Sequence, residues 1–148
     1  MRLDSDHRYR FTVPPEALWA AMANTADYRT WWPWLSAFEA NGLVAGDVWR
    51  CSVRPPLPYT LRFAIHLDGV VPTELIAARV AGDIAGTARI DVAPTGGGCD
   101  VRLTSSLAPS SRAFGLLAKL ARPIVRRGHD WVLDTGAGQF ASRAVEPR

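Results

Sequence analysis

The chain has few of the residues that build disulfide frameworks and metal sites. Its 148 residues include two cysteines and three histidines, and Cys51 and Cys99 stand far apart with no Cys-x-x-Cys pair. No two histidine, cysteine or carboxylate residues fall at the spacing that metal ligands favour. We therefore expect two buried free thiols, no disulfide framework, no metal and no cofactor.

Long apolar runs are missing too. No segment approaches the roughly 20 consecutive apolar residues of a membrane span, and the N-terminal segment carries acids where a secretory signal needs an apolar stretch. We therefore expect a cytoplasmic protein without stable membrane insertion. Motifs for a catalytic nucleophile, a carboxylate pair or a phosphate-binding loop are also absent, since the glycines at 96–98 lie in a predicted hairpin turn with no helix after it.

Lysine is nearly absent, so arginine supplies almost all of the positive charge. The 17 basic and 14 acidic residues give a net charge of +3. Basic residues gather toward the end of the chain, at Arg112, Lys119, Arg122, Arg126, Arg127 and Arg143. A solvated helix face and contact with anionic lipid or an acidic carrier protein are both open interpretations. No basic strand is interleaved with aromatic residues, so we expect no nucleic-acid partner.

The sequence does contain the pattern of an ordinary globular domain. Apolar residues make up 48% of the chain and charged residues 21%, values typical of soluble proteins. The length fits a single domain over residues 1–148. The alternation in Arg8–Val13 predicts a first strand, and Pro14-Pro15-Glu16 favours a helix start. A second short helix is expected over Ala26–Trp34.

Strand patterns dominate the middle of the chain. The expected strands are Leu35–Glu39, Asp47–Val53, Tyr59–Asp68, Glu74–Ala81, Asp83–Ala93 and Cys99–Leu107. Tyr59–Asp68 is the clearest, because apolar side chains at Tyr59, Leu61, Phe63, Ile65 and Leu67 alternate with polar ones. With no helix between them, these strands are expected to form one antiparallel sheet.

One long amphipathic helix over residues 112–143 is expected to close the fold. Its predicted apolar arc comprises Leu116, Leu117, Leu120, Ala121, Ile124 and Trp131. Pro123 removes a helical hydrogen bond and predicts a bend. The order of elements predicts an α+β helix-grip fold, in which a curved antiparallel sheet of about six to seven strands wraps around the long C-terminal helix, with two short helices after the first strand.

Two segments carry a resemblance to a known family. The opening RYRFTVPPEALWAAMANTADYRTWWPWL is similar to the first strand, the Trp-containing helix and the Tyr-x-x-Trp-Trp-Pro segment of the SRPBCC (START-like) superfamily, in its polyketide cyclase/dehydrase and lipid-transport branch. The closing ARPIVRRGHDWVLDTGAGQF resembles the end of that family's long helix, with its Arg-Pro and His-Asp-Trp elements. The resemblance covers essentially the whole chain in element order. It implies a cavity between sheet and helix that accepts a hydrophobic, often ring-containing molecule.

The expected ligand contacts come from the strands, the Trp-rich segment and the closing helix. They are Trp32, Trp34, Trp49, Tyr59, Phe63, Arg79, Leu103, Leu117, Leu120, Ile124 and Trp131. The Trp-rich segment is Trp31–Trp34. Aromatic rings can stack on a planar ligand, and the hydroxyl of Tyr59 can hydrogen-bond it. Arg79 is included because it shares strand parity with Leu75 and Ala77. Ordinary core packing is the alternative for each apolar residue.

No histidine is expected in the cavity, and no catalytic residue is assigned. His129 and Asp130 point about 100° apart on a helix and away from the predicted arc, so Asp130 is expected to pair with an arginine one turn earlier. His66 is expected on the outer face of the sheet. His7 is expected to be exposed ahead of the first strand.

Fold alone does not decide function in this superfamily. The leading hypothesis is a protein that binds a lipid-, polyketide- or terpenoid-like molecule in the cavity. The enzymatic alternative is a polyketide cyclase/dehydratase, in which Tyr59 and an arginine stabilise an enolate. A third is a stress or chaperone-partner module that uses its surface. Whether the protein is an enzyme, and whether it is a monomer or homodimer, stays open.

Overall fold

A computed structural model describes residues 2–56, 59–120 and 122–145. Within them, seven strands form one antiparallel sheet in the order β1-β7-β6-β5-β4-β3-β2. The strands are β1 (Leu3–Phe11), β2 (Leu35–Glu39), β3 (Val48–Val53), β4 (Leu61–Val71), β5 (Leu75–Gly82), β6 (Ile84–Thr95) and β7 (Gly98–Pro109). The predicted antiparallel sheet is therefore confirmed.

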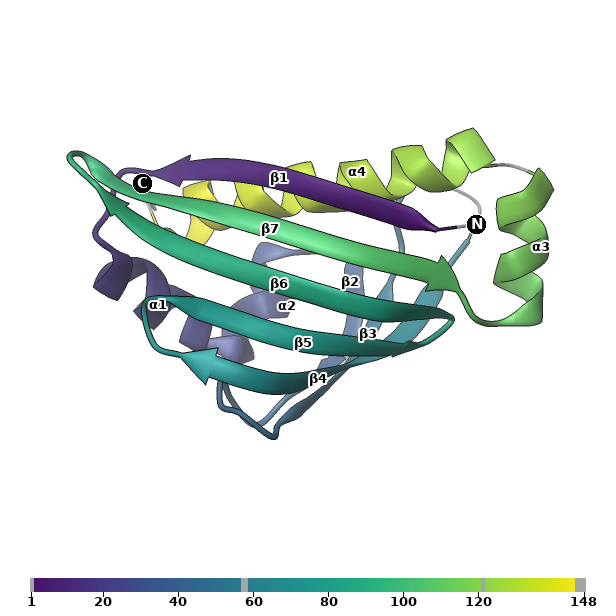
Figure 1. Cartoon of the computed structure of the whole chain (residues 1–148), viewed down its shortest axis with the longest axis horizontal. Coiled ribbons are helices and arrows are strands. Elements are labelled where there is room, and N and C mark those ends of the chain that lie inside the picture. Colours follow the sequence, from purple (N-terminus) through teal and green to yellow (C-terminus); the bar gives the residue numbers. More distant parts are fainter. Residues whose placement is uncertain (1, 57–58, 121, 146–148) are drawn as a thin grey trace.

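Six helical segments accompany the sheet in the described part of the chain. α1 (Pro15–Ala23), the 3-10 helix η1 (Thr25–Asp27) and α2 (Tyr28–Trp31) follow β1, whereas α3 (Arg112–Leu120), α4 (Arg122–Phe140) and the π-helix η2 (Ala141–Val145) follow β7. Figure 1 shows the curled sheet lying along α4, with α1 near the C-terminal end of α4 and α3 beyond its other end. This is the predicted helix-grip fold.

β1 starts earlier than the sequence analysis places it. Its charged residues alternate outward from Asp4 onward, and Asp6 pairs with Arg102 of β7 at 2.7 Å. Ser5 and His7 point to the partly buried face of the same strand. His7 therefore lies within the strand rather than ahead of it, which corrects the predicted exposure.

The predicted single helix over 112–143 is divided. α3 ends at Leu120 and α4 begins at Arg122. Pro123 therefore lies in the first turn of α4, where a missing N–H costs no helical hydrogen bond. Figure 1 shows α3 turned away from the axis of α4. The predicted bend is a change of helix, not a kink in one.

Two apolar clusters fill opposite ends of the space between the sheet and α4. One gathers around Phe11, Trp31 and Phe140, near the C-terminal end of α4. The other contains Leu3, Val80, Ile84, Leu107, Phe114 and Val125, near its start. Full burial of such side chains contributes about 1.5–3 kcal/mol each. Residues of both clusters line one cavity.

Candidate ligand cavity

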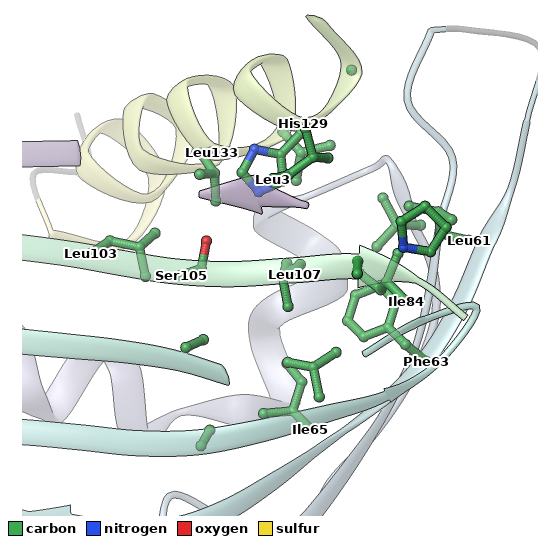
Figure 2. Close-up of a pocket in the computed structure, with 18 of the residues that line it drawn as sticks. Leu3, Leu61, Phe63, Ile65, Ile84, Leu103, Ser105, Leu107, His129 and Leu133 are labelled. Atoms are coloured by element: carbon green, nitrogen blue, oxygen red, sulfur yellow. The ribbon is translucent and has the colours of Figure 1, made fainter. Parts of the chain in front are cut away.

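A cavity of about 270 Å³ lies between the concave face of the sheet and α4. Figure 2 shows side chains of the strands and of α4 pointing toward this space. The wall is almost entirely apolar, and its larger members include Leu3, Trp49, Tyr59, Leu61, Phe63, Ile65, Leu67, Ile76, Ile84, Ile90, Leu103, Leu107, Phe114, Val125, Val132 and Leu133. Such a wall favours an apolar small molecule.

The hollow exists because small side chains meet across three adjacent strands. Ala78 of β5 pairs with Ala88 of β6, and Ala88 pairs with Ser105 of β7. Directly paired residues point to the same face of a sheet, so these three form one shallow strip. One flanking row carries larger residues throughout, namely Ile76, Ile90 and Leu103, and the other has Val80 and Leu107 on either side of Gly86.

One face of α4 covers the strip. Val125, Gly128, His129, Val132 and Leu133 line the cavity. Their spacing of three and four residues places them on one side of an α-helix. The same stripe continues to the buried Gly136 and Phe140. It brings one histidine into an otherwise apolar row, contrary to the prediction that no histidine reaches the cavity.

His129 has few polar neighbours. Its side chain is 15% exposed, and its Nδ1 is buried with no hydrogen-bond partner among the described residues. Oδ1 of Asp130 lies 3.6 Å from Nδ1, beyond hydrogen-bond length. Burial lowers the pKa of His129, and the Asp130 carboxylate offsets part of that effect. The imidazole is therefore neutral at neutral pH.

A second histidine lies behind Asp130, at the seam between β1 and α4. His7 places Nε2 3.7 Å from Oδ1 of Asp130 and Nδ1 3.4 Å from Oδ1 of Asp134. The hydroxyl of Tyr9 donates to Asp134 at 3.0 Å, and burial together with Asp134 raises the pKa of Tyr9. Asp130 thus lies beside two histidines, His7 and His129, and not beside an arginine as predicted. Arg126 donates instead to the carbonyl of Asp4 at 3.0 Å.

Four of the predicted ligand contacts lie on the cavity wall: Trp49, Tyr59, Phe63 and Leu103. Trp49 is fixed because its Nε1 donates to the carbonyl of Gly42 at 3.0 Å. The ring of Tyr59 packs against Phe114 with centroids 5.6 Å apart, and burial raises the pKa of its hydroxyl. Their contact with a ligand stays a prediction.

The other predicted tryptophans join the Trp-rich segment to α4 instead of lining the cavity. Nε1 of Trp32 donates to the carbonyl of Gly136 at 2.9 Å, and Nε1 of Trp34 donates to Oε1 of Gln139 at 2.8 Å. The rings of Trp34 and Trp131 meet edge to face at 6.4 Å. Their packing role is the alternative that the sequence analysis left open.

Arg79 lies on the outer face of the sheet. Its side chain is 63% exposed, and its Nε donates to Oδ2 of Asp68 at 2.8 Å. The predicted inward orientation is wrong because β5 carries apolar residues at both parities. The buried set is Ile76, Ala78 and Val80, so Arg79 takes the opposite parity.

The described members of the predicted apolar arc, Leu116, Ile124 and Trp131, do not line the cavity. Leu116 is 60% exposed and Ile124 is 38% exposed. The prediction assumes one continuous helix over residues 112–143 and assigns its apolar face accordingly. Because the chain changes from α3 to α4 within this range, residues of the two helices do not share one face. The side chains of Leu117 and Leu120 lie outside the described part of the structure.

Three polar residues of the wall are not among the predicted ligand contacts: Arg89, whose half-exposed side chain pairs with Asp91 at 3.0 Å, and His129 and Ser105. Phasing residues 122–140 alone places His129 beside Val125, Val132 and Leu133. Ser105 shares strand parity with its neighbours Leu103 and Leu107. Both residues can be found from the sequence, His129 once the start of α4 is known and Ser105 once the inward face of β7 is known.

The family comparison decides what kind of protein carries this cavity. Residues 4–145 match the family model described as "Polyketide cyclase / dehydrase and lipid transport". The chain belongs to this family. The resemblance noted from its two end segments is therefore confirmed. No curated protein matches the chain in sequence.

Solved structures share the fold of this polyketide cyclase/dehydrase and lipid-transport family member. Protein CV1439 from Chromobacterium violaceum is 17% identical with a TM-score of 0.71, over 98% of this chain and 99% of that one. The di-domain ARO/CYC BexL from the BE-7585A biosynthetic pathway is 17% identical with a TM-score of 0.72, over 99% of this chain and 51% of that one. Truncated norcoclaurine synthase from Thalictrum flavum is 14% identical with a TM-score of 0.69, over 100% of this chain and 96% of that one. At these identities the likeness shows the fold alone.

Other predictions concern thiols, metals and location. Cys51 and Cys99 are buried free thiols, as predicted, and burial raises the pKa of Cys51 to about 12. Within the described residues, no group of three histidine, cysteine or carboxylate side chains is placed to hold a metal ion. No helix there is long and apolar enough to cross a membrane. The cytoplasmic location and the single-domain organisation of this family member stay predictions.

Proposed function

We propose that this protein binds a lipid-, polyketide- or terpenoid-like small molecule in the cavity between the sheet and α4. The observation that carries the proposal is the almost wholly apolar wall around a space of about 270 Å³. Burial of apolar ligand surface supplies roughly 25 cal/mol per Å² before association costs. The family description, which names lipid transport, supports the same function.

Within this cavity the ligand lies against Trp49, Phe63 and Leu103. A planar ligand stacks on the indole or phenyl ring, whereas an aliphatic one packs on any of the three. Tyr59 lies at the α3 end of the wall, against Phe114. Its hydroxyl can hydrogen-bond a polar group at that end of a bound molecule.

Native mass spectrometry of freshly purified protein, compared with its denatured mass, tests the proposal. A reproducible extra mass that is lost on denaturation supports it and indicates the class of ligand. Titration with the neutral apolar fluorophore N-phenyl-1-naphthylamine provides a second measurement on ligand-free protein. A bare chain that also fails to bind the fluorophore contradicts the proposal.

A matched pair of variants locates the binding. Ala88→Phe puts a phenyl ring in the middle of the small-residue strip, and we expect it to abolish fluorophore binding. Ala81→Phe puts the same ring at an exposed position of β5, and binding should be unchanged. Equal binding by both variants places the ligand somewhere other than this cavity.

A polyketide cyclase/dehydratase is the second candidate, and His129 favours it. A neutral imidazole inside an apolar cavity can take a proton from the carbon between two carbonyls, so that this carbon bonds to a distant ketone carbon, and return the proton to the resulting alkoxide. A second proton taken from the same carbon and delivered to the new hydroxyl lets that hydroxyl leave as water while a C=C bond forms. Mass spectrometry of a short poly-β-ketone incubated with the protein measures that loss. Loss of water with the wild type but not with His129→Leu supports catalysis, and equal loss with both excludes this role of His129.

A further inference from the structure

His129 contributes to the cavity wall a polar side chain whose buried Nδ1 has no hydrogen-bond partner among the described residues. No hydrogen bond joins its Nε2 to another described residue. Figure 2 shows the imidazole projecting from α4 toward β7, where Ser105 lies. The Oγ atoms of Ser105 and Ser5 are 2.6 Å apart, so the Ser105 hydroxyl already has a partner.

We propose that His129 selects ligands that carry a single hydroxyl on an otherwise apolar body, and that Asp130 is the positioning residue that leaves Nε2 free to accept its hydrogen bond. This rests on the proposed function, because it names the class of ligand for the same cavity. Alcohols and phenols fit this description, whereas ethers and hydrocarbons of the same shape lack the donor.

The carboxylate of Asp130 sets which ring nitrogen carries the proton. Its Oδ1 lies 3.6 Å from Nδ1 of His129 and 3.7 Å from Nε2 of His7. A carboxylate beside one nitrogen of a neutral imidazole favours the tautomer with the proton on that nitrogen. Nε2 then has a lone pair and no hydrogen, and it can accept a hydrogen bond but cannot donate one.

The surroundings also exclude charged head groups. Aliphatic side chains, among them Leu3, Leu107, Val125, Val132 and Leu133, make up most of the cavity wall to which His129 belongs, and an ion buried among aliphatic side chains loses its hydration without compensation. The carboxylates of Asp130 and Asp134 further disfavour an anionic group beside His129. A neutral hydroxyl avoids both penalties.

A pair of probes that differ in one hydrogen-bond donor tests the proposal. 2-Naphthol and 2-methoxynaphthalene share one ring system, and calorimetric titration gives their affinities. We expect the wild type to bind 2-naphthol roughly 3- to 10-fold more tightly, the worth of one hydrogen bond. His129→Leu should bind both equally with the ether's affinity unchanged, and His129→Gln should restore part of the preference. Arg127→Leu, at an exposed position of α4 outside the cavity wall, is the control that should keep it.

Each outcome of these titrations decides a different claim. Equal affinities in the wild type, or a preference that survives in His129→Leu, overturn the hydroxyl proposal and leave the apolar cavity intact. Failure to bind either probe overturns the proposed function as well. If His129→Leu does not fold, the ¹⁵N spectrum of the wild-type imidazole decides, because the proposal requires an unprotonated Nε2 whose signal moves with 2-naphthol and not with the ether. A protonated Nε2 contradicts it.

Discussion

At the scale of single residues, a buried neutral histidine makes the fold sensitive to mild acid. In the unfolded chain an imidazole takes up a proton near pH 6.5. In the folded protein burial lowers the pKa of His129; Arg126 and His7 lower it further, and Asp130 opposes them. Just below pH 6.5 the unfolded state therefore binds more protons, and the free energy of unfolding falls as the pH falls, by at most about 1.4 kcal/mol per pH unit.

We expect His129→Gln to lose less stability than the wild type between about pH 7 and pH 5, because glutamine does not titrate. Urea denaturation at both pH values measures the difference. Leu133→Met, on the same stripe of α4 and without a titrating group, should retain the wild-type pH dependence. Parallel pH dependences for the wild type and His129→Gln would show that the imidazole accepts its proton in the folded state.

The same residue scale shows where the sequence predicts side-chain direction and where it does not. In β4, apolar and polar residues alternate, and the predicted inward residue Phe63 does line the cavity. In β5 both parities are apolar, so alternation cannot assign the inward face, and Arg79 is placed on the wrong side. The charge of Arg79 predicts its orientation better than strand parity does, because burying an unpaired guanidinium inside an apolar wall is costly.

At the scale of elements, Gly136 lets α4 approach the Trp-rich segment. A Cβ at this position would lie 3.1 Å from Cζ2 of Trp34. Trp34 cannot easily yield, because its ring stacks on Trp32 at 5.6 Å and its Nε1 donates to Gln139. The carbonyl of Gly136 also accepts the hydrogen bond from Trp32. The contact between helix and segment therefore depends on the missing side chain.

Two alanine substitutions in α4 separate close packing from helix propensity. Gly138 has open space around it, so Gly138→Ala should raise the free energy of unfolding by up to about 1 kcal/mol. Gly136→Ala gains the same propensity but displaces Trp34, and we expect a net loss relative to Gly138→Ala of about 1–3 kcal/mol. Urea denaturation measures both. Equal gains would mean that the Trp34 ring moves without cost.

Element boundaries explain most of what the sequence misses in the closing helix. For most strands the alternation gives nearly correct bounds, and β2 is predicted at Leu35–Glu39, where it is found. β1 is the exception, because it begins at Leu3 and not at Arg8. The closing helix is also recognised, but its phase is carried through the change from α3 to α4. An error of one residue turns a helix face by about 100°, which is why the arc containing Ile124 is predicted and the stripe containing His129 is missed.

At the scale of the whole molecule, the fold can be predicted from the order of elements, but the cavity cannot. The strip of Ala78, Ala88 and Ser105 exists because the register of β5, β6 and β7 aligns three small residues that lie far apart in the sequence. Register is not encoded by any one strand. A shift of two residues in the pairing of β6 with β5 and β7 would leave the same side chains facing inward. It would still replace part of this strip with larger side chains.

An open strip of this kind lowers the stability of the ligand-free protein, because apolar surface around a hollow lacks packing partners. Ala88→Ile adds a β-branched side chain at the centre of the strip, where strand propensity favours it. We expect the free energy of unfolding to rise by about 1 kcal/mol and binding of N-phenyl-1-naphthylamine to weaken. Ala81→Ile, exposed on β5, should change stability by less than about 0.5 kcal/mol. Calorimetric melting and fluorophore titration of Ala88→Ile together distinguish two cases. If Ala88→Ile is less stable than the wild type yet still binds, the strip is already packed. If it is more stable and no longer binds, the hollow costs stability and is kept for the ligand.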